Sequence, residues 1–133
     1  MFDPVLNNLP AFAAYFATAV VLLAAFLALY LRVTPYDELA LIREGNSAAA
    51  ISLAGAMVGY AIPIAVTVAV SHNLLTMVGW GIVACIVQSL TYLIARLAQP
   101  QINQAISQGQ IASGLFLASL SLAVGILNAG CIA

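Results

Sequence analysis

Four long apolar segments, separated by shorter polar stretches, make up most of the chain. They span residues 11–31, 48–70, 77–95 and 111–130, and none of them contains Asp, Glu, Lys or Arg. A helix of about 20 apolar residues crosses a hydrocarbon core of about 30 Å. The pattern therefore predicts an all-α membrane protein, with four transmembrane helices in a single membrane domain over residues 1–133.

The composition also indicates a lipid bilayer as the environment. Hydrophobic residues account for 65% of the chain and charged residues for 5%, whereas about a quarter of a soluble domain is charged. The net charge of −1 and the three basic residues exclude nucleic acid as a partner. Asp3 stands where a signal peptide would be basic, and the apolar run is long, so we expect an uncleaved first transmembrane helix.

The polar stretch between the first two apolar segments, residues 35–46, predicts a short helix in the membrane interface. Thr34 can cap its start and Pro35 suits its first position. Gly45 is placed to end it, and Asn46 or Ser47 to cap the second membrane helix. The charged residues of this docking loop are Asp37, Glu38, Arg43 and Glu44. Mixed charges of this kind indicate a solvated surface or, alternatively, a docking site for a cytoplasmic protein.

A weaker copy of this stretch occurs at residues 100–114. A constant offset of 64 residues aligns Arg32 with Arg96, Gly45 with Gly109 and Asn46 with Gln110. We therefore predict an internal repeat, with copies at about residues 11–71 and 75–133. Each copy holds two membrane crossings, so both face the same way, as tandem helical hairpins in a parallel repeat.

The distribution of arginine predicts the orientation. Arg32, Arg43 and Arg96 all fall in the two connections inside the repeats. Because basic residues concentrate in cytoplasmic loops, we expect both connections in the cytoplasm. Both termini and His72 would then be periplasmic.

Glycine and proline interrupt the second and fourth apolar segments. Gly55 and Gly59 have the GxxxG spacing that permits close helix approach, and Pro63 should kink its helix by leaving a carbonyl without its donor. Gly125 lies in the fourth segment. Interruptions at corresponding places in two halves point to a transport site. The small-residue faces Gly55/Gly59 and Ser121/Gly125 also predict a homo-oligomer.

Uncharged polar residues are the remaining candidates for a transport pathway. They are Asn46, Gln88, Thr91, Tyr92, Gln110, Ser121 and Asn128. One interpretation is a narrow polar path or a cation site. The alternative is that each residue hydrogen-bonds a neighbouring helix, for about 0.6 kcal/mol.

Several stretches resemble a known family. They are TPYDELALIREGNSAAAISLAGAMVGYAIP, the SHN that follows it, a third helix containing Trp80, and the closing AVGILNAG. Over nearly the whole chain the sequence resembles the YjfL-like bacterial inner-membrane proteins, a domain of unknown function. The resemblance implies a small four-helix protein of the bacterial inner membrane, with no settled activity and a link to envelope stress in some members.

The sequence offers little that could support catalysis or a cofactor. His72 is the single histidine, and Cys85 and Cys131 lack the spacing of a metal or redox site. We expect neither an enzyme nor a bound cofactor. A proton-coupled transporter needs an ionisable group inside the membrane, and the apolar segments hold none, which argues against proton-driven export.

Two functions are therefore open. The first is an oligomeric channel or permease-like component for a small ion or solute. The alternative is a non-transporting scaffold, or an envelope-stress partner, that presents the docking loop to a cytoplasmic protein.

Overall fold

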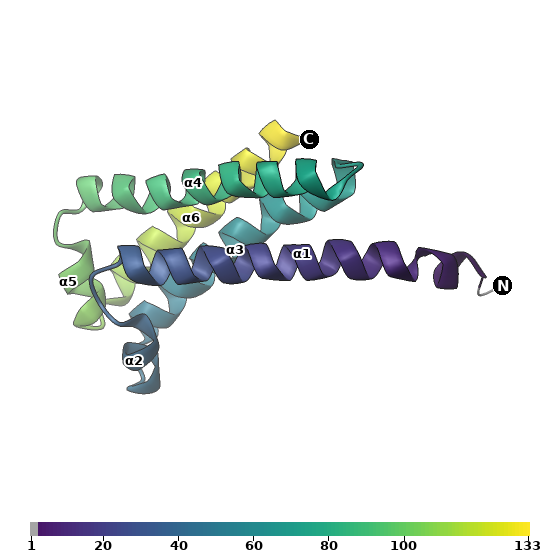
Figure 1. The fold of residues 1–133 in the computed structure, drawn as a ribbon. Helices are drawn as coiled ribbons and strands as arrows, with labels where there is room; N and C mark the ends of the chain where they lie inside the picture. Colours follow the sequence, from purple (N-terminus) through teal and green to yellow (C-terminus); the bar gives the residue numbers. More distant parts are fainter. Residues whose placement is uncertain (1–2) are drawn as a thin grey trace.

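A computed structural model describes residues 3–133 and contains six helices in that range. In chain order they are α1 (Asp3–Val33), α2 (Glu38–Arg43), α3 (Ser47–Val70), α4 (Leu74–Ala98), α5 (Ile102–Ser107) and α6 (Ile111–Ile132) (Figure 1). The four long helices are long and apolar enough to cross a membrane, and residues 3–133 contain no strand. The predicted all-α architecture with four transmembrane helices is confirmed.

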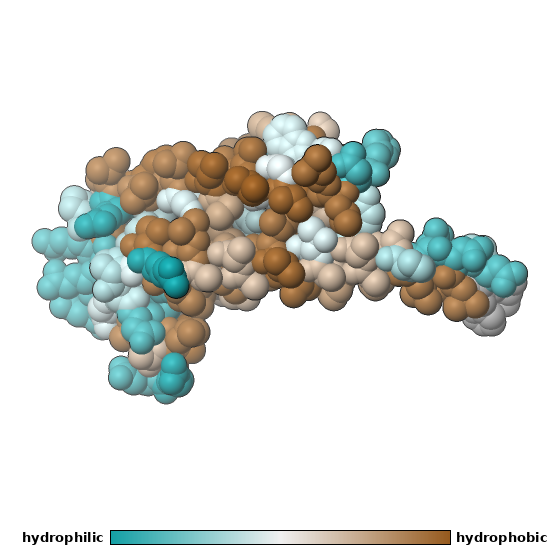
Figure 2. Space-filling model, in the orientation of Figure 1, coloured by the Kyte–Doolittle hydropathy of each residue, from teal (hydrophilic) through white to brown (hydrophobic). Residues whose placement is uncertain are grey.

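The two connections within the halves lie at one end of the bundle. In Figure 1, α2 and α5 lie at the same end, while the turn between α3 and α4 lies at the other. Figure 2 shows hydrophilic residues gathered around α2 and α5 and a hydrophobic band over the long helices. The chain thus has the polarity of a membrane-spanning bundle with one enlarged polar end.

The start of α2 differs from the prediction. Asp37 is its N-cap, and the Asp37 carboxylate accepts a hydrogen bond from the Ala40 amide at 3.2 Å. Thr34 instead closes α1, because its hydroxyl donates to the carbonyl of Tyr30 at 3.1 Å. The prediction that Thr34 caps the short helix, with Pro35 at its first position, is therefore wrong.

The ends of the two connections match residue for residue. Gly45 follows α2 with φ of 88°, and Gly109 follows α5 with φ of 82°. In each case the next residue donates its backbone N–H to the carbonyl five positions back, at 2.9 and 3.0 Å. A positive φ favours glycine, so Gly45 ends its short helix as expected, and Gly109 ends α5 in the same way. Asn46 then caps α3, accepting from the Ala49 amide at 3.0 Å.

The helices α3 and α6 form the tightest contact in the bundle. A Cβ atom at Gly55 would overlap Ala118, and one at Gly125 would overlap the carbonyl of Gly59. Ser121 lies on the same contact, beside Gly59. The small-residue faces predicted to join separate copies therefore pack against each other within one chain. Those faces give no support to a homo-oligomer, since their surfaces are already buried.

Aromatic residues attach α1 to the rest of the bundle. The ring of Phe26 stacks on Tyr60 of α3 with centroids 4.5 Å apart, and Tyr30 meets Tyr92 of α4 edge to face at 5.8 Å. The Tyr60 hydroxyl donates to the Gly81 carbonyl of α4 at 2.9 Å. Elsewhere α1 is the most exposed of the long helices. Its last turns are therefore fixed against α3 and α4, next to the polar end.

Candidate functional site

Gln88 and Ser121, two of the predicted pathway residues, meet where α3, α4 and α6 cross. The Gln88 side-chain amide donates to the Gly59 carbonyl at 3.0 Å and to the Ser121 carbonyl at 3.3 Å. Pro63 explains why the Gly59 carbonyl is free, because it has no N–H to complete the helical bond. The helix α3 nevertheless runs unbroken through Pro63. Gln88 thus supplies the donor that Pro63 lacks. This is the hydrogen bond to a neighbouring helix that we gave as the alternative to a transport pathway.

We expect Gln88→Leu to destabilise the protein by about 1 kcal/mol, since a buried carbonyl loses its donor. In a Pro63→Ala background the same substitution should cost less, because the restored backbone N–H can bond the Gly59 carbonyl. Thermal unfolding in detergent of the four combinations measures this coupling. An equal cost of Gln88→Leu in both backgrounds would contradict the assignment.

The other predicted pathway residues are spread along the bundle. Thr91 donates to the Val87 carbonyl of its own helix at 2.9 Å, and Tyr92 donates to Asn103 of α5. Asn46 donates to the Ile106 carbonyl at 2.9 Å, which joins the two connections. Gln110 occupies the N-cap of α6 but makes no side-chain cap bond, and the buried Nδ2 of Asn128 has no partner among the described residues. These residues therefore do not share one site.

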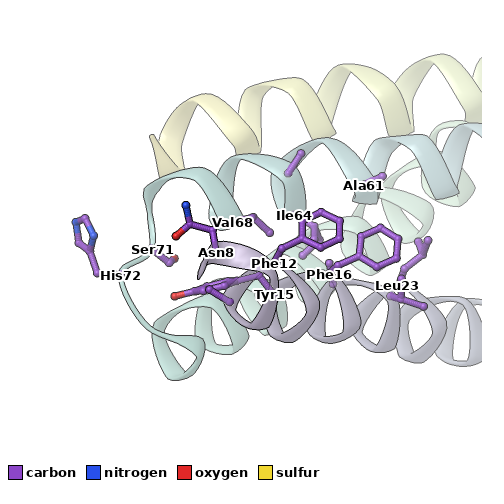
Figure 3. A pocket seen from close by; sticks show the side chains of 14 residues that line it. Asn8, Phe12, Tyr15, Phe16, Leu23, Ala61, Ile64, Val68, Ser71 and His72 are labelled. Atoms are coloured by element: carbon purple, nitrogen blue, oxygen red, sulfur yellow. The ribbon is translucent and has the colours of Figure 1, made fainter. Parts of the chain in front are cut away.

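A large apolar groove lies elsewhere. It has a volume of about 860 Å³ and runs between the first half of α1 and α3. Figure 3 shows Phe12 and Phe16 of α1 along it, opposite Ile64 and Val68 of α3, with His72 directed away. None of the predicted pathway residues lines this groove. Its chemistry fits lipid chains and not a polar solute.

The docking loop has an unexpected member. Asp37, Arg43 and Glu44 are exposed, as a solvated loop requires. Glu38 is 0% exposed, and neither of its carboxyl oxygens has a hydrogen-bond partner among residues 3–133. The prediction that Glu38 belongs to a solvated docking surface is wrong. The apolar segments still hold no ionisable group, but the connection between the first two of them holds a buried one.

Two tyrosine hydroxyls accompany the Glu38 carboxyl group. Tyr30 comes from the end of α1 and Tyr36 from the bend after it. Both lie close enough to Glu38 for its carboxyl group to influence their hydroxyls electrostatically. Both hydroxyls are buried and lack hydrogen-bond partners among the described residues. Tyr92 of α4 also lies within electrostatic range, and Ser52 of α3 lies beside Tyr36. Glu38, Tyr30 and Tyr36 thus form a cluster of unpartnered oxygen atoms, which we call the Glu38 pocket.

Burial changes the acidity of these groups. Loss of solvation raises the pKa of Glu38 to about 7, an effect that the Thr34 hydroxyl opposes and the negative charge of Asp37 reinforces. Burial raises the pKa of Tyr36 as well, with a further contribution from Glu38. The carboxyl group can therefore gain or lose a proton near neutral pH, while Tyr36 keeps its proton.

The second half of the chain provides an internal comparison. Ile102 is the first residue of α5, as Glu38 is the first residue of α2, and Ile102 is also 0% exposed. The same structural position is thus buried in both halves, and one half fills it with an apolar residue. Burial of an unpaired carboxyl group costs stability, so structure alone does not explain Glu38.

Comparison with known proteins now places the chain. A family model described as "Domain of Unknown Function (DUF350)" matches residues 4–132. The chain belongs to this family. It is 34% identical over 127 residues to the UPF0719 inner membrane protein YjfL of Escherichia coli strain K12, covering 96% of each chain. It is 31% identical over 122 residues to the UPF0719 transmembrane protein YshE of Bacillus subtilis strain 168, covering 90% of each. No solved structure matches it.

Membership of the DUF350 family confirms the resemblance to YjfL-like proteins. Together with the four apolar helices, it makes the chain a multi-pass protein of the inner membrane. The sequence did contain one signal for the Glu38 pocket. The offset of 64 residues aligns Glu38 with Ile102, and an apolar counterpart marks a buried position. The remaining signal, the approach of Tyr30 and Tyr36, depends on the fold.

Proposed function

We propose that the protein is a permease-like component that passes a small cation across the inner membrane, with the Glu38 carboxyl group handling the cation. The supporting observation is that Glu38 is 0% exposed while both its oxygens lack partners. A carboxyl group buried without partners costs stability, and a buried group with a perturbed pKa is a candidate for a functional site. The role is one of transport and not of enzymatic catalysis.

The proposed assembly contains a duplicated unit and more than one copy of the chain. The matching starts of α2 and α5, and of α3 and α6, support two parallel hairpins related by duplication. Four helices packed around small residues leave little room for a continuous path within one chain. A homo-oligomer would supply the remaining walls, and the exposed α1 is the helix available for that contact.

We also propose that the end carrying α2 and α5 is cytoplasmic. Arg32 lies in the last turn of α1, Arg43 ends α2 and Arg96 lies in the last turn of α4, and all three are exposed at this end of the bundle. The concentration of arginine on one side supports a cytoplasmic location for it. The termini and the turn at His72 would then be periplasmic.

Cysteine labelling in intact cells tests this orientation. In a background without Cys85 and Cys131, we expect Arg43→Cys and Gln108→Cys both to resist a membrane-impermeant maleimide and to react after permeabilisation. Both positions are exposed, so burial does not prevent the reaction. Reaction of the two positions from opposite sides would contradict the parallel repeat.

Cation flux in proteoliposomes tests the function. The wild-type protein should dissipate an imposed proton or sodium gradient, and Glu38→Gln should lower the rate at least tenfold because it removes the charge that attracts the cation. Glu44→Gln is the matched control, since Glu44 is an exposed acid of the same connection. Equal rates for wild type and Glu38→Gln would overturn the role given to Glu38.

The scaffold function remains the second candidate, supported by the exposure of Asp37, Arg43 and Glu44 at the polar end. It predicts no flux in proteoliposomes. It also predicts loss of a co-purifying cytoplasmic protein when these three residues are neutralised together. Retention of that protein by the triple variant would count against it.

A further inference from the structure

The unpartnered atoms of the Glu38 pocket are all oxygens. They are the two carboxyl oxygens of Glu38 and the hydroxyls of Tyr30 and Tyr36. Glu38 is the first residue of α2, Tyr30 lies at the end of α1, and Tyr36 lies in the bend between the two helices. Buried polar atoms in folded proteins are nearly always satisfied. Four such atoms on three neighbouring side chains indicate that the pocket holds something that supplies their missing interactions.

The type of atom limits what that ligand can be. Carboxylate and hydroxyl oxygens are hard ligands, which suit alkali and alkaline-earth cations better than thiophilic metals. No cluster of three or more His, Cys, Asp or Glu residues with metal-binding geometry occurs in residues 3–133. The pocket therefore lacks the set of acidic ligands with which proteins hold calcium.

The charge of the pocket limits the ligand further. Glu38 is its one buried acid, while Asp37 beside it is exposed. On the side of α4, Tyr92 is bonded to Asn103, and Arg96 acts on Tyr92 from an exposed position. The helix α3 contributes Ser52, whose hydroxyl donates to the Ala49 carbonyl. One monovalent cation would neutralise the carboxylate, whereas a divalent cation would leave a buried positive charge.

We propose that the Glu38 pocket is a binding site for one monovalent alkali cation, held by the Glu38 carboxylate and by the hydroxyl oxygens of Tyr30 and Tyr36. This inference rests on the proposed function for the role of the site and adds its ligand class. Each ligand atom keeps its covalent bonds, and the cation loses part of its water shell to the three side chains. Asp37 and Leu39 flank Glu38 on the exposed side of α2, so the cation enters from the polar end.

Binding to the purified protein tests the proposal without any measurement of flux. At pH 8 in detergent, sodium chloride should raise the unfolding temperature in a saturable manner relative to choline chloride at equal ionic strength. The increase should be absent in Glu38→Gln and Glu38→Leu and retained in Glu44→Gln. Tyr36→Phe should weaken the apparent affinity for sodium several-fold, because it removes one oxygen ligand and keeps the ring.

Potassium and magnesium chlorides complete the test. A saturable increase with either sodium or potassium supports the proposal. It is overturned if neither salt differs from choline chloride with the folded wild-type protein, or if magnesium gives the larger increase. Saturable sodium binding without flux would refute the transport function and leave the binding site. Proton flux through Glu38 without alkali-cation binding would refute the site and leave the function.

Discussion

Replacement of Glu38 by leucine is expected to stabilise the protein at pH 8 by about 3 kcal/mol. At this pH the buried carboxyl group is charged, and its pKa of about 7, against the usual 4.5 of a glutamate, reflects the cost of that charge. Leucine has a similar size and needs no partner. Ile102 shows that the equivalent position in α5 accepts an apolar side chain at 0% exposure.

Thermal unfolding followed by circular dichroism, in a detergent buffer made with choline salts, measures this effect. Glu44→Leu serves as the control, because Glu44 is exposed and such substitutions usually change stability by no more than about 0.5 kcal/mol. The stabilised Glu38→Leu variant should at the same time lose cation flux. A destabilised variant would mean that Glu38 has partners in the folded state and that its burial is structural.

The second large effect is a loss of stability as the pH rises. The pKa of Glu38 is 4.5 in the unfolded chain and about 7 in the folded protein. Between these two pH values the folded state keeps the Glu38 proton that the unfolded state has released. The folded state then binds more protons, so the free energy of unfolding falls with increasing pH. The protonated Glu38 therefore contributes about 3 kcal/mol to the free energy of unfolding. This contribution is fully present below pH 4.5 and is lost above about pH 7.

The Glu38→Gln variant isolates this contribution, since its side chain does not titrate. We expect the unfolding temperature of the wild type to fall between pH 5 and pH 8 in choline buffers, and that of Glu38→Gln to fall much less. Glu44→Gln, which keeps the buried acid, should follow the wild type. Parallel curves for wild type and Glu38→Gln would show that the Glu38 pKa is not raised in the folded protein.

Local features of the sequence determined the secondary structure and the membrane location. In a bilayer, the backbone polar groups of a run of about 20 apolar residues find their hydrogen bonds within a helix. The four long helices therefore follow from hydropathy. Gly45 ends α2 because its positive φ is a backbone property, and Asn46 caps α3 through an amide three residues away. Thr34 was misassigned because it can bond within α1 or cap α2, and local sequence does not decide between them.

The tertiary structure decided which residues are buried and with what they interact. Gly59 and Gly125 could have joined separate chains, but they pack within one, and Gln88 bonds the carbonyl that Pro63 leaves free. In the sequence alone, Glu38 does not differ from the other charged residues of the docking loop. Its burial depends on how the start of α2 packs against the rest of the bundle, which no local pattern encodes. Hydropathy assigns residues to the membrane or to water, whereas the loss of solvation at one carboxyl group depends on its neighbours in space.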